Sequence, residues 1–170
     1  MKKLLFLAAV LILPLGSSAQ VAKYKAVFTI NFIRYIGWPE AAKKGDFIIG
    51  VVRDKETADF LRNNSKNKKF GFQDVVIKEF KSPDDITYCQ VLFIPDNINL
   101  SKNASKILDK LGGKNTLIIT EKEGATKYGS MINFVIKDNK LKFEIHKENA
   151  AKLGLQISSK LENMASAIKL

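Results

Sequence analysis

Phe47-Ile48-Ile49-Gly50-Val51-Val52, which Asp54 follows after one residue, is the stretch of sequence that decides the fold. A continuous apolar run of this length, rich in β-branched residues, is typical of a strand covered on both faces of a parallel sheet. Parallel strands need long crossover connections, which are usually helices. The stretch therefore predicts a layered α/β domain.

The segments around this strand follow the same plan. A nearly all-apolar helix is expected over residues 22–37, ended by Trp38-Pro39 because the residue before a proline is pushed out of the helical region. Further helices are expected over residues 56–63 and 101–111, the second capped by Ser101 and finished by Gly112-Gly113. Further strands are expected over residues 74–78, 90–94 and 116–120.

The C-terminal third has a different pattern. Residues 131–137 and 141–146 flank Asp138-Asn139-Lys140 and predict a β-hairpin. An apolar stripe with helical spacing follows: Ala150, Leu153, Ile157, Leu161, Met164 and Ile168. Gly154 fits a helix end, and Ser159 with Glu162 fits a new helix start, so a break in this stripe is also indicated. The predicted fold class is α/β: a single three-layer domain with a mostly parallel sheet, flanking helices and a C-terminal β-hairpin followed by helix.

The N-terminus predicts a secretory signal peptide over residues 1–19. Lys2 and Lys3 precede the apolar run 4–13, and small residues stand at Ser17 and Ala19, three and one positions before the expected cut. The predicted domain is therefore residues 20–170. The apolar run is too short to span a bilayer core of roughly 30 Å, so the mature protein is not expected to span a membrane itself.

The charge is positive but dispersed. Removing Lys2 and Lys3 lowers the formal net charge of +11 by two, to +9. Nearly all of this charge is lysine scattered along the chain, and only Arg34, Arg53 and Arg62 could supply a planar guanidinium fork. No recognition stripe is visible, so the charge indicates surface solubility and argues against nucleic-acid binding.

The sequence carries few groups for catalysis. There is no phosphate-binding glycine loop, no nucleophile elbow and no paired Cys or His for a metal, so we expect no catalytic residue, no metal and no cofactor. His146, the only histidine, closes a strand ahead of a helix, where capping a backbone group is the simpler role. Cys89 is the only cysteine, cannot form an internal disulfide and is expected to be a buried small hydrophobe. The protein is therefore not expected to be an enzyme.

One edge of the predicted sheet could hold a ligand. In a parallel sheet the carboxyl ends of the strands meet at one edge, which here carries Arg53, Asp54, Pro95, Asp96, Glu121 and Gly124. A small-molecule site would have Asp54, Glu121, Gly124 or Asn133 among its ligand-binding residues. The alternative is that these are ordinary turn residues.

Several blocks of sequence resemble the YfiR-like family of secreted proteins. They include Asn31-Phe32-Ile33-Arg34-Tyr35-Ile36-Gly37-Trp38-Pro39, the strand at 47–52 with Asp54, and residues 89–94. The most specific block comes last: Gly129-Ser130-Met131-Ile132-Asn133-Phe134-Val135, residues 141–145 and residues 150–161. The blocks occur in the family's order across essentially the whole predicted mature chain.

The resemblance implies a periplasmic regulator without catalysis of its own. Relatives of this kind hold an inner-membrane diguanylate cyclase inactive by engaging its periplasmic sensing domain, and this changes biofilm behaviour. Relatives that sense redox state use several cysteines, so the single Cys89 does not support a thiol switch here. The implied partner is an inner-membrane signalling protein, a cyclase or a sensor kinase.

The helix at 22–37 offers a surface for such a partner. Its aromatic residues Phe28, Phe32, Tyr35 and Trp38 could anchor an interface, since buried aromatics often dominate binding. The alternative is that this helix is buried inside the monomer. A helix this apolar also makes a homodimer plausible.

Overall fold

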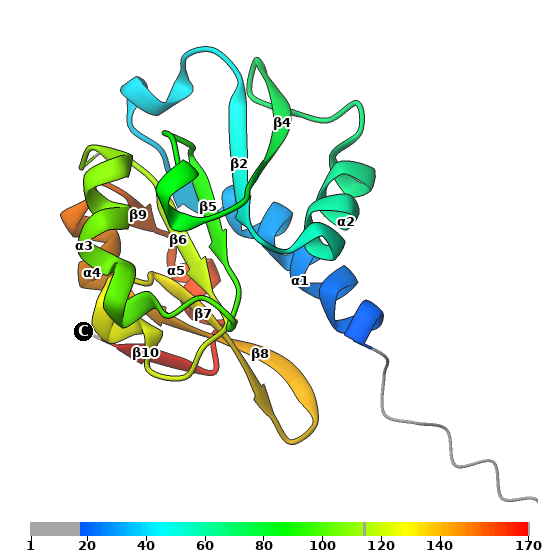
Figure 1. The fold of residues 1–170 in the computed structure, drawn as a ribbon, viewed down its shortest axis with the longest axis vertical. Helices are drawn as coiled ribbons and strands as arrows, with labels where there is room; N and C mark the ends of the chain where they lie inside the picture. Colours follow the sequence, from blue (N-terminus) through cyan, green and yellow to red (C-terminus); the bar gives the residue numbers. More distant parts are fainter. Residues whose placement is uncertain (1–17, 114, 170) are drawn as a thin grey trace, which may run out of the picture.

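An eight-stranded sheet forms the middle of the fold (Figure 1). The computed structural model describes residues 18–113 and 115–169, so the predicted signal peptide lies outside the described residues except for Ser18 and Ala19. The strand order is β10-β8-β7-β6-β5-β2-β4-β3. The strands are β2 (Phe47–Val52), β3 (Lys69–Phe70), β4 (Gln73–Phe80), β5 (Val91–Ile94), β6 (Leu117–Thr120), β7 (Ile132–Lys137), β8 (Lys140–His146) and β10 (Ala167–Lys169).

The five central strands β4, β2, β5, β6 and β7 run parallel, as the apolar 47–52 stretch predicts. The edges are mixed, because β8 is antiparallel to β7 and β3 is antiparallel to β4. Five of the six residues of β2 are buried, with Ile49 and Val51 on one face and Val52 on the other. The predicted strand is confirmed residue for residue.

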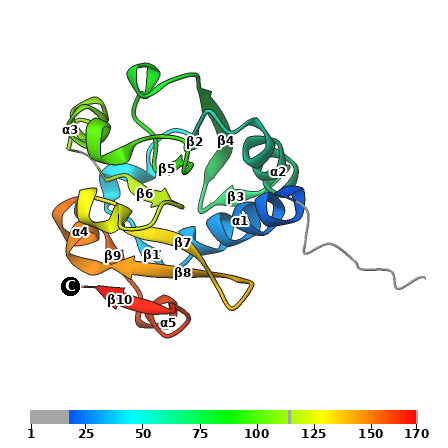
Figure 2. The same ribbon diagram turned by 60° about the horizontal axis from the view of Figure 1, so that its bottom comes forward.

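Helices cover both faces of the sheet and complete three layers (Figure 2). On one face, α1 (Ser18–Ile33) and α2 (Lys55–Ser65) close the larger apolar core, which includes Ala26, Ile30 and Leu61. On the other face, α3 (Leu100–Leu111) closes a smaller core with Ile107 and Leu111. The predicted three-layer α/β class is confirmed. None of the helices in the described part of the chain is long and apolar enough to cross a membrane.

The first helix ends earlier than predicted. It ends at Ile33, and residues Ile36–Gly37 form a short strand, β1, that pairs with β9 (Gln156–Ile157). The Trp38 indole N–H donates to the Ile33 carbonyl over 3.0 Å and so satisfies one of the acceptors left free at the helix end. The proline rule placed the end too late because the pairing partner lies some 120 positions away in the sequence.

The C-terminal stripe is not one helix. It divides into α4 (Lys147–Lys152), β9, α5 (Ser159–Glu162) and β10, and Gly154 adopts φ 71° at the predicted break. Ile168 lies in β10, which pairs parallel with β8. The predicted break at Gly154 is therefore confirmed, and the stripe does not form one continuous helix. The chain also contains the short 3-10 helices η1 (Glu40–Lys43), η2 (Pro83–Asp85) and η3 (Ala125–Tyr128).

Local caps explain several boundaries. Asn99, and not the predicted Ser101, caps α3 by accepting from the Lys102 N–H over 3.1 Å, while Gly112 ends the helix at φ 64° as predicted. His146 caps α4 through its Nδ1 atom, which accepts from the Asn149 N–H at 3.4 Å. This is the structural role that the position of His146 indicates.

Candidate functional site

Helix α1 leaves two large apolar side chains exposed. Ala22, Ala26 and Ile30 lie in the core, yet Tyr24 and Val27 on the opposite side are 48% and 36% exposed. The same outer side also carries the exposed polar residues Gln20, Lys23 and Asn31, as expected of a helix that covers a sheet. Tyr24 and Val27 are the apolar exceptions on this mixed surface, and large exposed apolar side chains can mark an interaction site.

The outer side of α1 faces the β7–β8 hairpin across an apolar groove. One hollow of about 650 Å³ lies between Phe28, Phe32 and Tyr35 on one side and Phe143 and Met164 on the other. Its remaining lining residues are Asn31, Lys137, Leu141, Lys142 and Ser166. Figure 2 shows α1 running beside the hairpin.

A second hollow of about 610 Å³ continues the first. It is lined by Gln20, Val21, Tyr24, Phe28, Ile136, Asn139, Lys140 and Leu141. Phe28 and Leu141 line both hollows, so we treat the two as one surface and call it the apolar groove. Its rim carries exposed apolar side chains, since Ile136 is 60% and Met164 is 50% exposed.

Packed aromatic rings form the floor of the apolar groove. The Phe32 ring lies 4.7 Å from Phe143 and 5.7 Å from Phe134, measured between centroids, and Phe28 lies 6.0 Å from Phe32. Phe32 is only 2% exposed, whereas Phe28 and Tyr35 are half-buried. The floor is thus closely packed, and aromatic pairs in this distance range attract one another.

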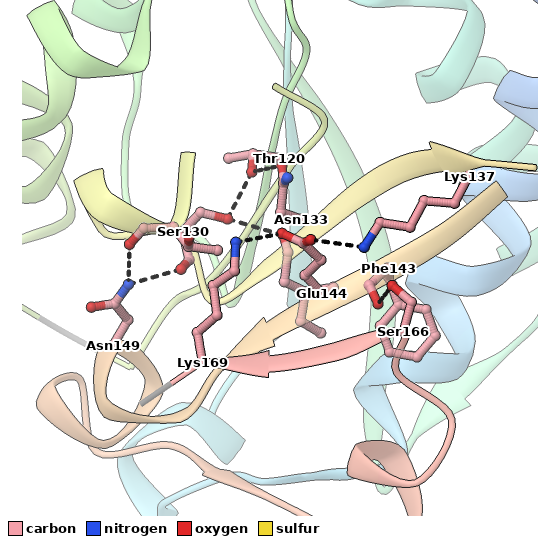
Figure 3. Close-up of polar contacts among 11 residues, drawn as sticks. Thr120, Ser130, Asn133, Lys137, Phe143, Glu144, Asn149, Ser166 and Lys169 are labelled. Carbon is pink, nitrogen blue, oxygen red and sulfur yellow. Dashed lines mark hydrogen bonds and ion pairs between the residues drawn. The ribbon is translucent and has the colours of Figure 1, made fainter. Parts of the chain in front are cut away.

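Glu144 fixes the hairpin side of the groove (Figure 3). Its carboxylate accepts from Lys137 Nζ at 3.3 Å and from Lys169 Nζ at 2.6 Å, which ties β7, β8 and β10 together. Burial on its own would raise the pKa of Glu144. The hydrogen bonds from Lys169 and Lys137 outweigh this effect, so the pKa lies below its usual value.

A buried polar network lies at the end of β6, behind the hairpin (Figure 3). Thr120 Oγ1 donates to Asn133 Oδ1 at 2.6 Å and lies 2.7 Å from Ser130 Oγ. The Asn149 amide donates to the Thr126 and Ser130 carbonyls. The three residues Thr120, Ser130 and Asn133 are each at most 1% exposed, so this network joins β6 and β7 internally.

The predicted partner-binding residues are divided between two places. Phe28, Phe32 and Tyr35 line the apolar groove. Trp38 does not, because its ring packs edge-on against Phe47 at 5.2 Å and lines a separate hollow beside the fully exposed Phe72. The buried-helix alternative holds for Phe32 and fails for Tyr24 and Val27, which remain exposed.

The predicted ligand-binding residues are engaged with the protein. Asp54 caps α2 by accepting from the Thr57 N–H at 2.9 Å and its hydroxyl at 2.6 Å. Glu121 pairs with Lys25 of α1 and accepts from the Asp96 N–H at 3.1 Å. Gly124 turns the chain at φ 73°, and Asn133 is buried in the network above.

These four residues do not converge on one cavity. Asp54 follows β2 and Glu121 follows β6, and β5 lies between those strands. The hollow that Glu121 lines holds only about 150 Å³. Small-molecule pockets usually hold about 300 to 1,000 Å³.

The hairpin side of the groove was missed by sequence reasoning. Leu141, Phe143 and Met164 come from segments read as ordinary strand and helix. The available signal was Ile136, an apolar residue two positions before Asp138 of the hairpin turn, where solvent exposure is expected.

The described residues offer neither an accessible thiol nor a cluster of metal ligands. Cys89 is fully buried, and burial raises the pKa of its thiol to about 12. Among residues 18–113 and 115–169 no group of three or more His, Cys, Asp or Glu side chains could hold a metal ion.

Comparison with known proteins gives one result. A family model, DUF4154, described as YfiR/HmsC-like, matches residues 22–166. That range includes the whole of the sheet except β10, and all of the apolar groove except Gln20 and Val21. No curated protein matches the chain.

Proposed function

Because the chain belongs to the YfiR/HmsC-like family, we propose that it is a non-catalytic periplasmic regulator of an inner-membrane signalling protein. In this proposal it binds the partner's extracytoplasmic sensing domain and modulates its output. The partner is a diguanylate cyclase, whose product is cyclic di-GMP, or a sensor kinase. The domain begins after a signal peptide of residues 1–19.

The apolar groove is the observation that carries this proposal. Tyr24, Ile136 and Met164 are each about half exposed or more. Their apolar surface leaves water only when another molecule covers it, and this removal from water is favourable. Aromatic side chains that are already held by packing lose little conformational freedom on binding. Phe28, which lines both hollows, and Tyr35, which lines the first, are half-buried and are the anchors in this interpretation.

Charges at the groove favour an acidic partner surface. Lys137, Lys140 and Lys142 line it, and the described residues that line it include no acid. Lys137 and Lys142 pair with Glu144 and Asp138, respectively, while no ion pair of Lys140 is recorded within the described chain. Complementary rim charges speed association more than they tighten it.

Modulation of output requires a difference in affinity between two partner states. A regulator that binds the inactive state of the sensing domain more tightly shifts the population toward that state. A hundredfold preference corresponds to about 2.7 kcal/mol, which is within reach of a few buried aromatic contacts.

The test uses exposed groove residues, so that the fold is preserved. Tyr24→Asp, Ile136→Asp and Met164→Asp should each weaken recovery of the inner-membrane partner at least tenfold and shift cyclic di-GMP or kinase output toward that of a deletion strain. Phe72→Asp is the matched control, because Phe72 is fully exposed but lies outside the groove. Wild-type output from all three groove variants, with melting temperatures unchanged, would exclude the groove as the docking site.

Small-molecule binding at the strand-end edge is the alternative function. Its support is weaker because Asp54, Glu121 and Asn133 already have partners within the protein. A thermal-shift screen tests it, since a ligand at about 100 times its Kd adds about 2.7 kcal/mol to the stability of the folded state. A shift that disappears in Glu121→Gln would favour the alternative.

A further inference from the structure

The sheet has an open edge at β4, far from the apolar groove. β4 pairs with β2 along residues 75–80, but β3 covers only Gln73 and Asp74 on its other side. Figure 1 shows β4 at the outer side of β2. Asn67 adopts the left-handed φ of 59° just before β3. The chain turns at this residue, so the segment that precedes β3 does not continue the pairing along β4.

The free backbone groups can be assigned. The Phe80 carbonyl accepts from the Arg53 N–H, so Phe80 points its backbone toward the β2 side. Because backbone direction alternates along a strand, Val75, Ile77 and Glu79 point their N–H and C=O groups outward. A strand rises by about 3.3 Å per residue. The outward groups from Val75 to Glu79 can therefore pair with an added strand of five or six residues.

The flank of this edge is basic. A shallow hollow of about 540 Å³ lies between residues 62–68 and residues 74–77. The nearby acids are neutralised, since Glu79 pairs with Arg62 and Asp74 pairs with Lys69 at 2.9 Å. Lys66 and Lys68 are exposed, and no ion pair with either is recorded among the described residues.

We propose that the β4 edge, with Lys66 and Lys68 beside it, accepts an extended acidic segment of a partner chain as an added strand. The outward groups of Val75, Ile77 and Glu79 bond to its backbone, and the two lysines select its carboxylates. A second copy of this chain fits less well, because pairing two such edges would bring like charges together.

Two variants separate the backbone from the charge contribution. Glu79→Pro removes an outward N–H while the β2 side keeps its bonds, and proline is tolerated at such an edge position. Glu79→Gln, which keeps the N–H but loses the carboxylate that pairs with Arg62, is its control. Lys66→Glu with Lys68→Glu reverses the flank. Lys122→Glu with Lys127→Glu is the matched control, because both lysines are exposed and lie near η3.

The probe is a displayed library of random twelve-residue peptides, selected on protein purified after expression of the full chain. The expected consensus alternates acidic with β-branched or aromatic residues, and affinity should fall at least tenfold on Glu79→Pro and on the Lys66/Lys68 double variant, but not on the control. Slowed amide exchange at Ile77 and Glu79 on peptide addition should locate the site.

Other outcomes overturn the proposal. Selected peptides without acidic residues, or peptides that bind Glu79→Pro as tightly as wild type, would remove it. A wild-type dimer that Glu79→Pro converts to monomers would assign the edge to a second copy. Since Tyr24→Asp leaves β4 untouched, its effect on the apolar groove is measured separately.

Discussion

Cys89 shows at the scale of one residue how burial removes chemistry. The thiol lies against Gly50, whose missing Cβ would stand 3.1 Å from the Cys89 sulfur and 2.5 Å from the Phe80 ring. Water cannot stabilise a thiolate there, so the pKa of Cys89 rises to about 12.

Cys89 is predicted to resist thiol reagents while the protein is folded. At pH 8 the thiolate fraction is minute and no reagent reaches the sulfur. Mass spectrometry after iodoacetamide treatment should find less than about one-hundredth of the labelling rate seen in guanidinium chloride. Rapid labelling of the native protein would show that the β2–β5 region opens.

Glu144 is predicted to make stability pH-dependent in acid. Its folded pKa is lowered, so its contribution is present above the ordinary value near 4.5 and is lost as the pH falls toward the folded pKa. Wild type should melt higher than Glu144→Gln at pH 7, with the gap in melting temperature closing as the pH falls below about 4.5. A gap that widens in acid would contradict the ion-pair assignment, and Glu148→Gln, an exposed acid, is the control.

Individual site residues were predictable only in part. Phe28, Phe32 and Tyr35 stand out in the sequence as aromatics on an overly apolar helix, and they line the groove together. Their neighbours Leu141, Phe143 and Met164 are more than 100 positions away. No local pattern encodes such a contact, because it arises when β7 and β8 add to the sheet beside α1.

At the scale of elements, a helix or strand is predicted correctly when the residues that determine it are close together in the sequence. β2 and the hairpin follow from apolar runs and turn residues that are adjacent in sequence, and both appear as predicted. The end of α1 depends on the pairing of β1 with Ile157, and β10 depends on its pairing with Ile145. Neither pairing can be predicted from the residues next to it in the sequence. Tertiary pairing overrode a helical stripe in both cases.

The hairpin turn gives a prediction at this scale. Asp138 and Asn139 adopt φ 53° and 57°, the left-handed pair that a two-residue turn of type I′ requires. Asn139→Val should lower the free energy of unfolding by about 1–2 kcal/mol, because a β-branched residue is strained there. Asn139→Gly is the control and should be neutral or slightly stabilising. Chemical denaturation measures both, and equal stability of the two variants would contradict this turn assignment.

At the scale of the whole molecule, the two proposed surfaces lie on different parts of the sheet. The apolar groove uses α1, β7 and β8, whereas the open edge is β4, with β6, β5 and β2 between them. Lysines lie beside both surfaces: Lys137, Lys140 and Lys142 at the groove, and Lys66 and Lys68 at the β4 edge. A regulator built this way could hold one partner by apolar contact and a second segment by backbone pairing.

The central claim is that the apolar groove docks on an inner-membrane signalling protein. Site-specific photo-crosslinking in living cells measures this directly, with the crosslinking amino acid at the position of Tyr24, Ile136 or Met164, and at Phe72 as the control. The account predicts one shared inner-membrane adduct from the three groove positions and none from Phe72. No adduct from the groove positions, or the same adduct from Phe72 alone, would contradict it.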